Sequence, residues 1–468
     1  MGQNKLRGKD LSAIHYTSNK AKSLAIDLMA RHYKHWSKQE QLVLLQQVQQ
    51  DPAAFISHEL LGMLAAEFMP EPELKPREEV ALLRSSGQLQ VFGRKGIASN
   101  ALQQMELAMR LPIAVKGALM PDAHQGYGLP IGGVLATRNA VIPYGVGVDI
   151  GCRMSLSIYA IGPEYLRRNA YSFKQSLKEK TCFGTGGELG ITQEHPVLDN
   201  PAFGLTPLLR QLHGKAVKQL GTSGSGNHFV EWGIAGLEEG NGLGLEKGEY
   251  LALLSHSGSR GLGAAIANHY TQLARNSCLL PRQANHFAWL ELESEAGAEY
   301  WLSMQLAGDY AKACHDQIHY HLSRYMGIKP VARVENHHNF AWKERGEEGE
   351  ECVVHRKGAT PAAEGELGII PGSMAAKGYI VRGRGNPAGL NSASHGAGRR
   401  LSRQQARESF TGSELKKVLS REGVTLIGGG IDEAPIAYKN LEEVMACQRE
   451  LVDVIGSFTP KIVRMDKN

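Results

Sequence analysis

The chain has 468 residues, 42% of them hydrophobic, which is enough apolar material for a large globular core. A net charge of +5 excludes a polycation that binds nucleic acid over its whole surface, so any basic site must be local. The six cysteines show no paired spacing, and no apolar run reaches the roughly 18 residues that span a membrane. We therefore expect a reduced, cytoplasmic protein without membrane spans.

The first part of the chain is predicted to be helical. Apolar residues recur at helical spacing from about residue 23 to 68, and Ser37 followed by Glu40 fits a capping box. Several prolines and a charged link then end the pattern. We predict a helical extension with its linker over residues 1–85 and a separate main domain over residues 86–468.

The main domain reads as short β-like runs separated by glycine motifs, with one long helix over about residues 296–326. Because no regular strand–helix–strand rhythm appears, we predict a single large α+β domain of mixed sheets flanked by helices. The long helix carries His315 and His319 four residues apart, a spacing that zinc ligands use. No glutamate base lies between them as in that motif, and we interpret these histidines as a half-exposed helix face.

Four glycine-rich motifs supply candidate metal ligands. Residues 147–152 place a carboxylate and a thiol three positions apart, and the other three motifs each contain histidine. The candidates are Asp149, Cys152, His228, His256 and the pair His337/His338. One carboxylate, one thiolate and three imidazoles form a mixed hard and soft set, which suits Mn, Fe, Co or Zn better than Mg or Ca.

The most distinctive stretch runs over residues 367–407, which contain seven Lys or Arg and no Asp or Glu. Guanidinium groups and glycine-rich backbone both suit bound phosphates. His395 lies among small residues within this stretch, and a neutral imidazole can attack phosphorus. His395 is therefore a candidate nucleophile; the alternative is an ordinary histidine in a basic surface loop.

In this order the motifs resemble the RtcB family of RNA-splicing ligases. The matching segments are PDAHQGYGLPIGGV (residues 121–134), VGVDIGCRM, GSGNHFVEW, HSGSRG, HHNFAW, HRKGATPA, PGSM, SHGAGRRLSR (residues 394–403) and DEAPIAYK (residues 432–439). The resemblance covers the chain from about Leu89 to its end. It implies one RtcB-like catalytic domain, with residues 1–85 lying outside the family core.

The resemblance also implies an activity. Members of the family are GTP- and manganese-dependent enzymes that join RNA ending in a 2′,3′-cyclic phosphate or 3′-phosphate to RNA with a 5′-hydroxyl. By similarity, His395 would become covalently guanylylated, and the GMP would then pass to the RNA to give an RNA–ppG end. The implied partners are GTP and these RNA ends. The residues leave open whether an activating protein partner is needed.

Site residues are carried over where this sequence matches the family. The implied ligands of two Mn²⁺ ions are Asp149, Cys152, His228, His256 and His338. The implied GTP-binding residues are Asn227, Phe229, Glu231, Asn339, Ser373, Ala397, Gly398 and Lys467. The Glu231 carboxylate would face the N1–H and 2-amino edge of guanine, which adenine lacks. The residues implied to contact RNA are His124, Lys357, Arg399 and Arg403, whereas Asp122 receives no role.

Three alternatives stay open. A nucleotidylyltransferase that caps 3′-phosphate ends with GMP without efficient sealing would keep the guanylylation of His395 but join no strands. A non-catalytic RNA-binding or repair-complex subunit would keep its function without His395. A metal-dependent phosphohydrolase would need neither GTP nor His395. The natural RNA and the role of residues 1–85 do not follow from the sequence.

Overall fold

The computed structural model describes residues 6–56, 58, 60–69, 79–85, 87–346 and 349–466. The chain forms two compact units, Met1–Glu78 and Glu79–Asn468, which are described separately. The sequence prediction placed the boundary of the main domain after residue 85.

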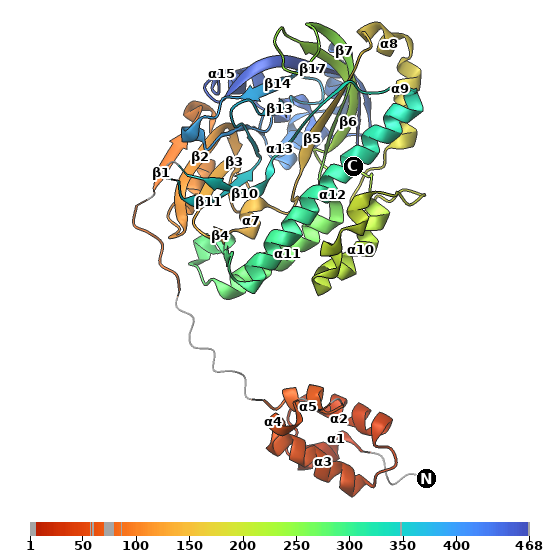
Figure 1. The fold of residues 1–468 in the computed structure, drawn as a ribbon, viewed down its shortest axis with the longest axis vertical. Helices are drawn as coiled ribbons and strands as arrows, with labels where there is room; N and C mark the ends of the chain where they lie inside the picture. Colours follow the sequence, from red (N-terminus) through yellow and green to blue (C-terminus); the bar gives the residue numbers. More distant parts are fainter. Residues whose placement is uncertain are drawn as a thin grey trace. The chain divides into compact units, whose positions relative to one another are not determined.

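The N-terminal unit is helical, as predicted (Figure 1). Its helices are α1 (Gly8–Ala13), α2 (Asn19–His32), α3 (Lys38–Gln50), α4 (Pro52–Phe55) and α5 (Gly62–Ala66). Ser37 and Glu40 form the predicted capping box at the start of α3: the Ser37 hydroxyl accepts from the Glu40 amide, and the Glu40 carboxylate accepts from the Ser37 amide. The buried hydroxyl of Tyr16 donates to Leu45 O at 2.8 Å, which ties the first loop to α3.

The first sheet of the larger unit has five strands in the order β1-β2-β3-β11-β10. Their bounds are β1 (Gln88–Val91), β2 (Ala114–His124), β3 (Ile131–Thr137), β10 (Asn339–Arg345) and β11 (Glu351–Lys357). The β1–β2 pair is parallel, and the others are antiparallel. The end of β2 and the start of β10 carry residues of the site described below.

The second sheet has the order β13-β14-β17-β6-β7-β5-β9, with β16 pairing with β17. Its strands are β5 (Arg153–Tyr159), β6 (Phe229–Leu237), β7 (Gly248–Ser257), β9 (Ala332–His337), β13 (Leu367–Ile370), β14 (Gly378–Gly383), β16 (Thr425–Ile427) and β17 (Val452–Met465). Two short pairs complete the strands: β4 (Ala140–Val141) with β8 (Leu290–Glu291), and β12 (Ala359–Pro361) with β15 (Ser392–Ser394).

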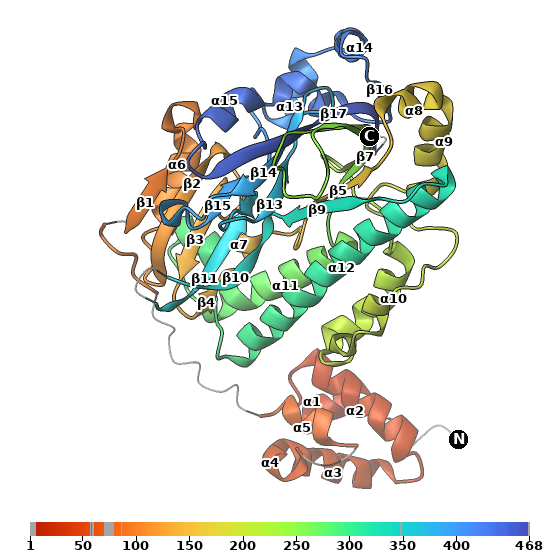
Figure 2. The same cartoon turned by 45° about the horizontal axis from the view of Figure 1, so that its top comes forward.

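Helices flank these sheets, which confirms the predicted mixed α+β domain. The longer ones are α6 (Ser99–Ala108), α9 (Ala170–Lys180), α10 (Pro207–Gln219), α11 (Arg260–Ser277), α12 (Glu295–Met326) and α14 (Gly412–Arg421); the shorter are α7 (Pro143–Val146), α8 (Pro163–Arg168), α13 (Arg403–Ser409) and α15 (Leu441–Ala446). Helices α11 and α12 lie side by side in both views (Figures 1 and 2). Within the described residues, no helix combines the length and apolar character needed to cross a membrane.

The interpretation of His315 and His319 as a half-exposed face is wrong, because α12 packs against β5 and β7 and buries both rings. His315 Nδ1 lies 2.6 Å and His319 Nε2 lies 2.8 Å from the Ser255 hydroxyl. His319 Nδ1 lies 2.7 Å from the Ser157 hydroxyl, and His315 Nε2 lies 3.1 Å from Ser257 O. Burial, together with the neighbouring histidine, lowers the pKa of His315 well below its usual value, so the network joins neutral rings to serines.

Candidate metal and nucleotide site

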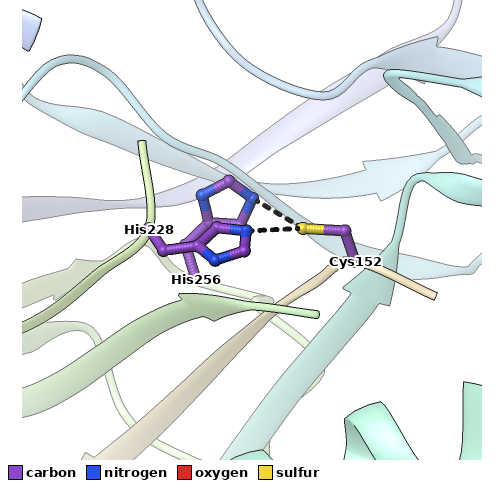
Figure 3. A group of neighbouring side chains, drawn as sticks. All are labelled: Cys152, His228 and His256. Atoms are coloured by element: carbon purple, nitrogen blue, oxygen red, sulfur yellow. Dashed lines mark hydrogen bonds between the residues drawn. The ribbon is translucent and has the colours of Figure 1, made fainter. Parts of the chain in front are cut away.

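The candidate ligands meet where three strands of the second sheet end. β7 pairs antiparallel with both β5 and β6, and His256 in β7 lies opposite Phe229 and Met154. This register brings His228, just before β6, and Cys152, just before β5, next to His256. Cys152 Sγ lies 3.3 Å from His228 Nε2 and 3.2 Å from His256 Nε2, and all three side chains are buried (Figure 3).

Asp149 and His338 extend this cluster. Asp149 Oδ2 lies 2.9 Å from His228 Nε2, and His338 Nε2 lies 3.1 Å from His256 Nε2. The backbone at Gly258 passes so close that a Cβ there would lie 1.9 Å from Asp149 Oδ1, which only glycine permits. The structure therefore brings together all five residues that the sequence nominated as metal ligands.

The chemistry of the cluster fits a transition metal. His256 Nδ1 lies 3.1 Å from Asn227 O and must carry the proton of that hydrogen bond, which leaves the Nε2 lone pair facing the cluster. Burial and the nearby His228 lower the pKa of His256 to about 3, so this ring is neutral and able to ligate. Burial and Asp149 raise the pKa of Cys152 well above its usual value, so a bound metal must displace the thiol proton.

A cavity of about 310 Å³ adjoins the cluster, a size within the range of small-molecule sites. Six of the residues assigned to GTP line it: Asn227, Phe229, Glu231, Ser373, Ala397 and Gly398. Burial raises the pKa of Glu231 well above its usual value, so hydrogen-bond donors from a ligand would be needed to stabilise its ionised carboxylate. Within the described part of the chain, the buried hydroxyl of Ser373 has no hydrogen-bond partner.

One of the two remaining residues assigned to GTP lies elsewhere, and the other is not described. Asn339 does not line the cavity: its side chain accepts from the Gly358 amide at 2.9 Å and donates to Asp149 O at 3.3 Å. It therefore braces the loop that carries Asp149. Lys467 lies outside the described residues.

His395 lies at the edge of the same cavity, and its ring centroid is 5.0 Å from that of His338. Its Nδ1 lies 2.7 Å from Asp122 Oδ2, which also accepts from the His395 backbone amide at 3.3 Å. Because a carboxylate accepts, Nδ1 carries the proton and the lone pair is at Nε2. A Cβ at Gly398, where φ is +73°, would lie 2.0 Å from Asp122 O, so this glycine permits the close approach.

Asp122, which contacts His395, is the residue to which sequence reasoning gave no role. It lies in the PDAHQG motif, which carried the resemblance without giving this residue a role. Its side chain is fully buried, and within the described residues its Oδ1 has no hydrogen-bond partner. Sequence alone does not show that the end of β2 meets the loop after β15.

The residues assigned to RNA are divided between two places. His124, Arg399 and Arg403 line the cavity, whereas the Lys357 ammonium donates to Tyr127 O and, at 3.1 Å, to Tyr144 O. Lys357 is therefore directed at backbone carbonyls of the loop before β3 and of helix α7.

The two arginines are already paired with carboxylates. Arg399 Nη1 lies 3.0 Å from Glu433 Oε2, and Arg403 Nη1 lies 2.7 Å from Asp432 Oδ2. Both carboxylates are buried, and they are the first two residues of the DEAPIAYK motif. These two adjacent acids are the sequence feature that could have predicted partners for the arginines. Much of the positive charge of these arginines is thus offset within the protein.

The fold and the site define a class of protein: a mixed α+β domain with a buried carboxylate–thiol–imidazole cluster, next to a cavity edged by an oriented histidine. The family model for "tRNA-splicing ligase RtcB" matches residues 104–202 and 205–466. The chain belongs to the RtcB family, and the predicted resemblance is confirmed.

Similar proteins of known name agree with this assignment. The chain is 34% identical over 388 residues to the RNA-splicing ligase RtcB of Escherichia coli K12, covering 77% of this chain and 92% of that protein. It is 28% identical over 442 residues to RNA-splicing ligase RtcB homolog 1 of Entamoeba dispar, covering 76% and 80%. It is 29% identical over 420 residues to the tRNA-splicing ligase RtcB of Thermococcus kodakarensis, covering 74% and 86%.

Proposed function

We propose that this protein is a GTP- and manganese-dependent RNA ligase that joins RNA 2′,3′-cyclic phosphate or 3′-phosphate ends to 5′-hydroxyl ends. The observation that carries the proposal is the pair His395–Asp122, which lies beside both the metal cluster and the cavity. Membership of the RtcB family and the names of the relatives support an RNA ligase. We also propose a cytoplasmic location; the described residues contain no helix that could span a membrane.

His395 begins the reaction as the nucleophile. Its Nε2 lone pair attacks the α-phosphorus of GTP, the bond to the β-phosphate oxygen breaks, and pyrophosphate leaves. The Asp122 carboxylate holds the proton at Nδ1 and stabilises the positive charge that develops on the ring. Two Mn²⁺ ions, held by Asp149, Cys152 and the cluster histidines, would neutralise phosphate charge when bound.

The cavity supplies the selectivity for guanine. The Glu231 carboxylate offers two acceptors to the N1–H and 2-amino donors of guanine, whereas adenine has no such pair. The Ser373 hydroxyl, buried without a partner in the described residues, is a ready contact for the nucleotide. Phe229 also lines the cavity and offers an aromatic surface to the base.

The RNA then takes the GMP from His395. An oxygen of the RNA 3′-phosphate attacks the phosphorus of histidyl-GMP, the P–N bond breaks, and an RNA–ppG end forms. The 5′-hydroxyl oxygen of the second RNA attacks the activated 3′-phosphorus, loses its proton, and GMP leaves. A cyclic phosphate must first be opened by water to a 3′-phosphate. His124 on the cavity wall is a candidate contact for these RNA phosphates.

The test is incubation with GTP labelled at the α-phosphate and Mn²⁺, followed by denaturation. Wild type and a His269→Ala control, altered at an exposed histidine in α11, should retain acid-labile, alkali-stable label, and His395→Ala should retain none. Joining of the two RNA ends is then measured in the same preparations. Label without joining would favour the GMP-capping alternative, and the absence of label from wild type would refute the mechanism.

A further inference from the structure

Two depressions lined by basic side chains lie one after the other: the first adjoins the central cavity, and the second adjoins the first. The first shares Ser373, Ala376, Ala397 and Tyr438 with that cavity and adds Lys377, Arg400, Arg421 and Lys439. The second contains Arg400 and Lys439 again, together with Arg94 and Lys95. Because neighbouring depressions share lining residues, they form one surface that extends from the cavity. We call it the basic groove, defined by Lys377, Arg400, Lys439, Arg94 and Lys95.

The positive charge of the basic groove is largely unpaired. Arg94, Lys95 and Arg400 are exposed, and among the described residues no carboxylate forms an ion pair with them. Arg421 pairs with Glu422 at 3.1 Å and is therefore left out of the definition. The lining also contains two carboxylates, Glu442 and Glu443, so the five cations exceed the negative charges of the groove. The charge available to a polyanion thus lies in the groove more than at Arg399 and Arg403, which already have buried carboxylate partners.

Lys439 connects the basic groove to the reacting centre. Its ammonium donates to Pro121 O at 3.1 Å and to Ala123 O at 2.8 Å, the carbonyls on either side of Asp122. Asp122 in turn holds His395. Lys439 thus links the basic groove to the backbone on either side of Asp122, the carboxylate that contacts His395.

We propose that the basic groove holds the sugar–phosphate backbone of one RNA strand where it leaves the reaction centre at His395. This inference rests on the proposed ligase function and adds a path for the substrate. A group of cations beside a site of phosphate chemistry suits the repeated negative charges of a nucleic acid strand, and contacts of this kind do not depend on base sequence. The central cavity suits a mononucleotide, whereas the groove extends beyond it.

The test compares Lys95→Glu/Arg400→Glu with Lys178→Glu/Lys218→Glu, a control that reverses two exposed lysines on α9 and α10. Full-length proteins are mixed, without GTP, with labelled single-stranded RNA of about 16 nucleotides, the upper end of single-strand site sizes. One probe ends in a 3′-phosphate and the other in a 5′-hydroxyl. Dinucleotides with the same ends, which extend less far from the reaction centre, serve as matched ligands.

We expect the groove variant to bind one of the two long probes at least tenfold more weakly than the control, with dinucleotide binding unchanged. The probe that loses affinity identifies the strand. Each phosphate contact to a single strand contributes about −0.7 to the slope of log K against log salt. Loss of two contacts removes about 1.4 from that slope, so between 50 and 200 mM salt the control should lose about sevenfold more affinity than the variant.

Equal binding of both long probes by the groove variant and the control would overturn the proposal. So would binding of oligoglutamate, instead of either RNA, in a way that depends on Lys95 and Arg400, because the groove would then serve an acidic protein segment. Guanylylation of His395 is measured in parallel and should be unchanged in the groove variant. Because the binding assay contains no GTP, absence of label would count against the ligase mechanism alone.

Discussion

The buried carboxylate of Asp122 should control the first chemical step. Replacing it by Asp122→Asn keeps the shape and removes the charge that faces His395 Nδ1 at 2.7 Å. A hydrogen bond to a charged group contributes roughly 1.5–3 kcal/mol, which corresponds to about 10- to 150-fold in rate at about 1.36 kcal/mol per tenfold. If the amide turns its NH₂ toward the ring, the proton moves to Nε2 and the loss is larger, on the order of 10⁴-fold.

Single-turnover labelling of His395 by GTP with Mn²⁺ gives this rate directly. GTP binding, measured separately, should stay near that of wild type, since Asp122 does not line the cavity. Asp199→Asn, at an exposed aspartate, is the matched control. A labelling rate equal to that of wild type in a folded Asp122→Asn protein would refute the orienting role, and a matching loss of GTP binding would indicate a structural one.

Three further outcomes are expected. Cys152→Ser should weaken Mn²⁺ binding, measured by titration of the metal, by more than about 100-fold. That figure is the upper end for residues that only orient a metal ligand, and a direct ligand should exceed it. Unchanged Mn²⁺ affinity would exclude the Cys152 thiolate as a ligand. Glu231→Gln should cut the preference for GTP over ATP in labelling by roughly 10- to 100-fold, because one guanine donor is left unpaired; an unaltered preference would place guanine elsewhere. Burial lowers the pKa of Lys357 to about 7, against about 10.4 in the unfolded chain. Between these values only the unfolded state holds the proton, so the free energy of unfolding should rise with pH by up to about 1.4 kcal/mol per unit. In denaturant unfolding at pH 7 and pH 9, Lys357→Met should lack this rise in the free energy of unfolding. The same rise in wild type and Lys357→Met would contradict the lowered pKa.

The sequence by itself determined the features that are written locally. The capping box at Ser37 and Glu40 and the long helix α12 follow from cap chemistry and residue preference along one segment. The ligand types, and His395 in an acid-free stretch, are likewise visible in short motifs. Their collinear order was enough to identify the RtcB family.

Only the tertiary structure decided which of these motifs meet. The contact of Asp122 with His395 joins the end of β2 to the loop after β15, two segments far apart in the chain, and no local pattern contains that contact. The exposure of a helix face depends on what packs against it, which is why His315 and His319 proved to be buried. The ion pair of Arg399 with Glu433 likewise offsets a positive charge that the acid-free stretch of sequence left without a partner. Packing, burial and charge pairing are properties of long-range contacts, so they appear only when the chain is folded.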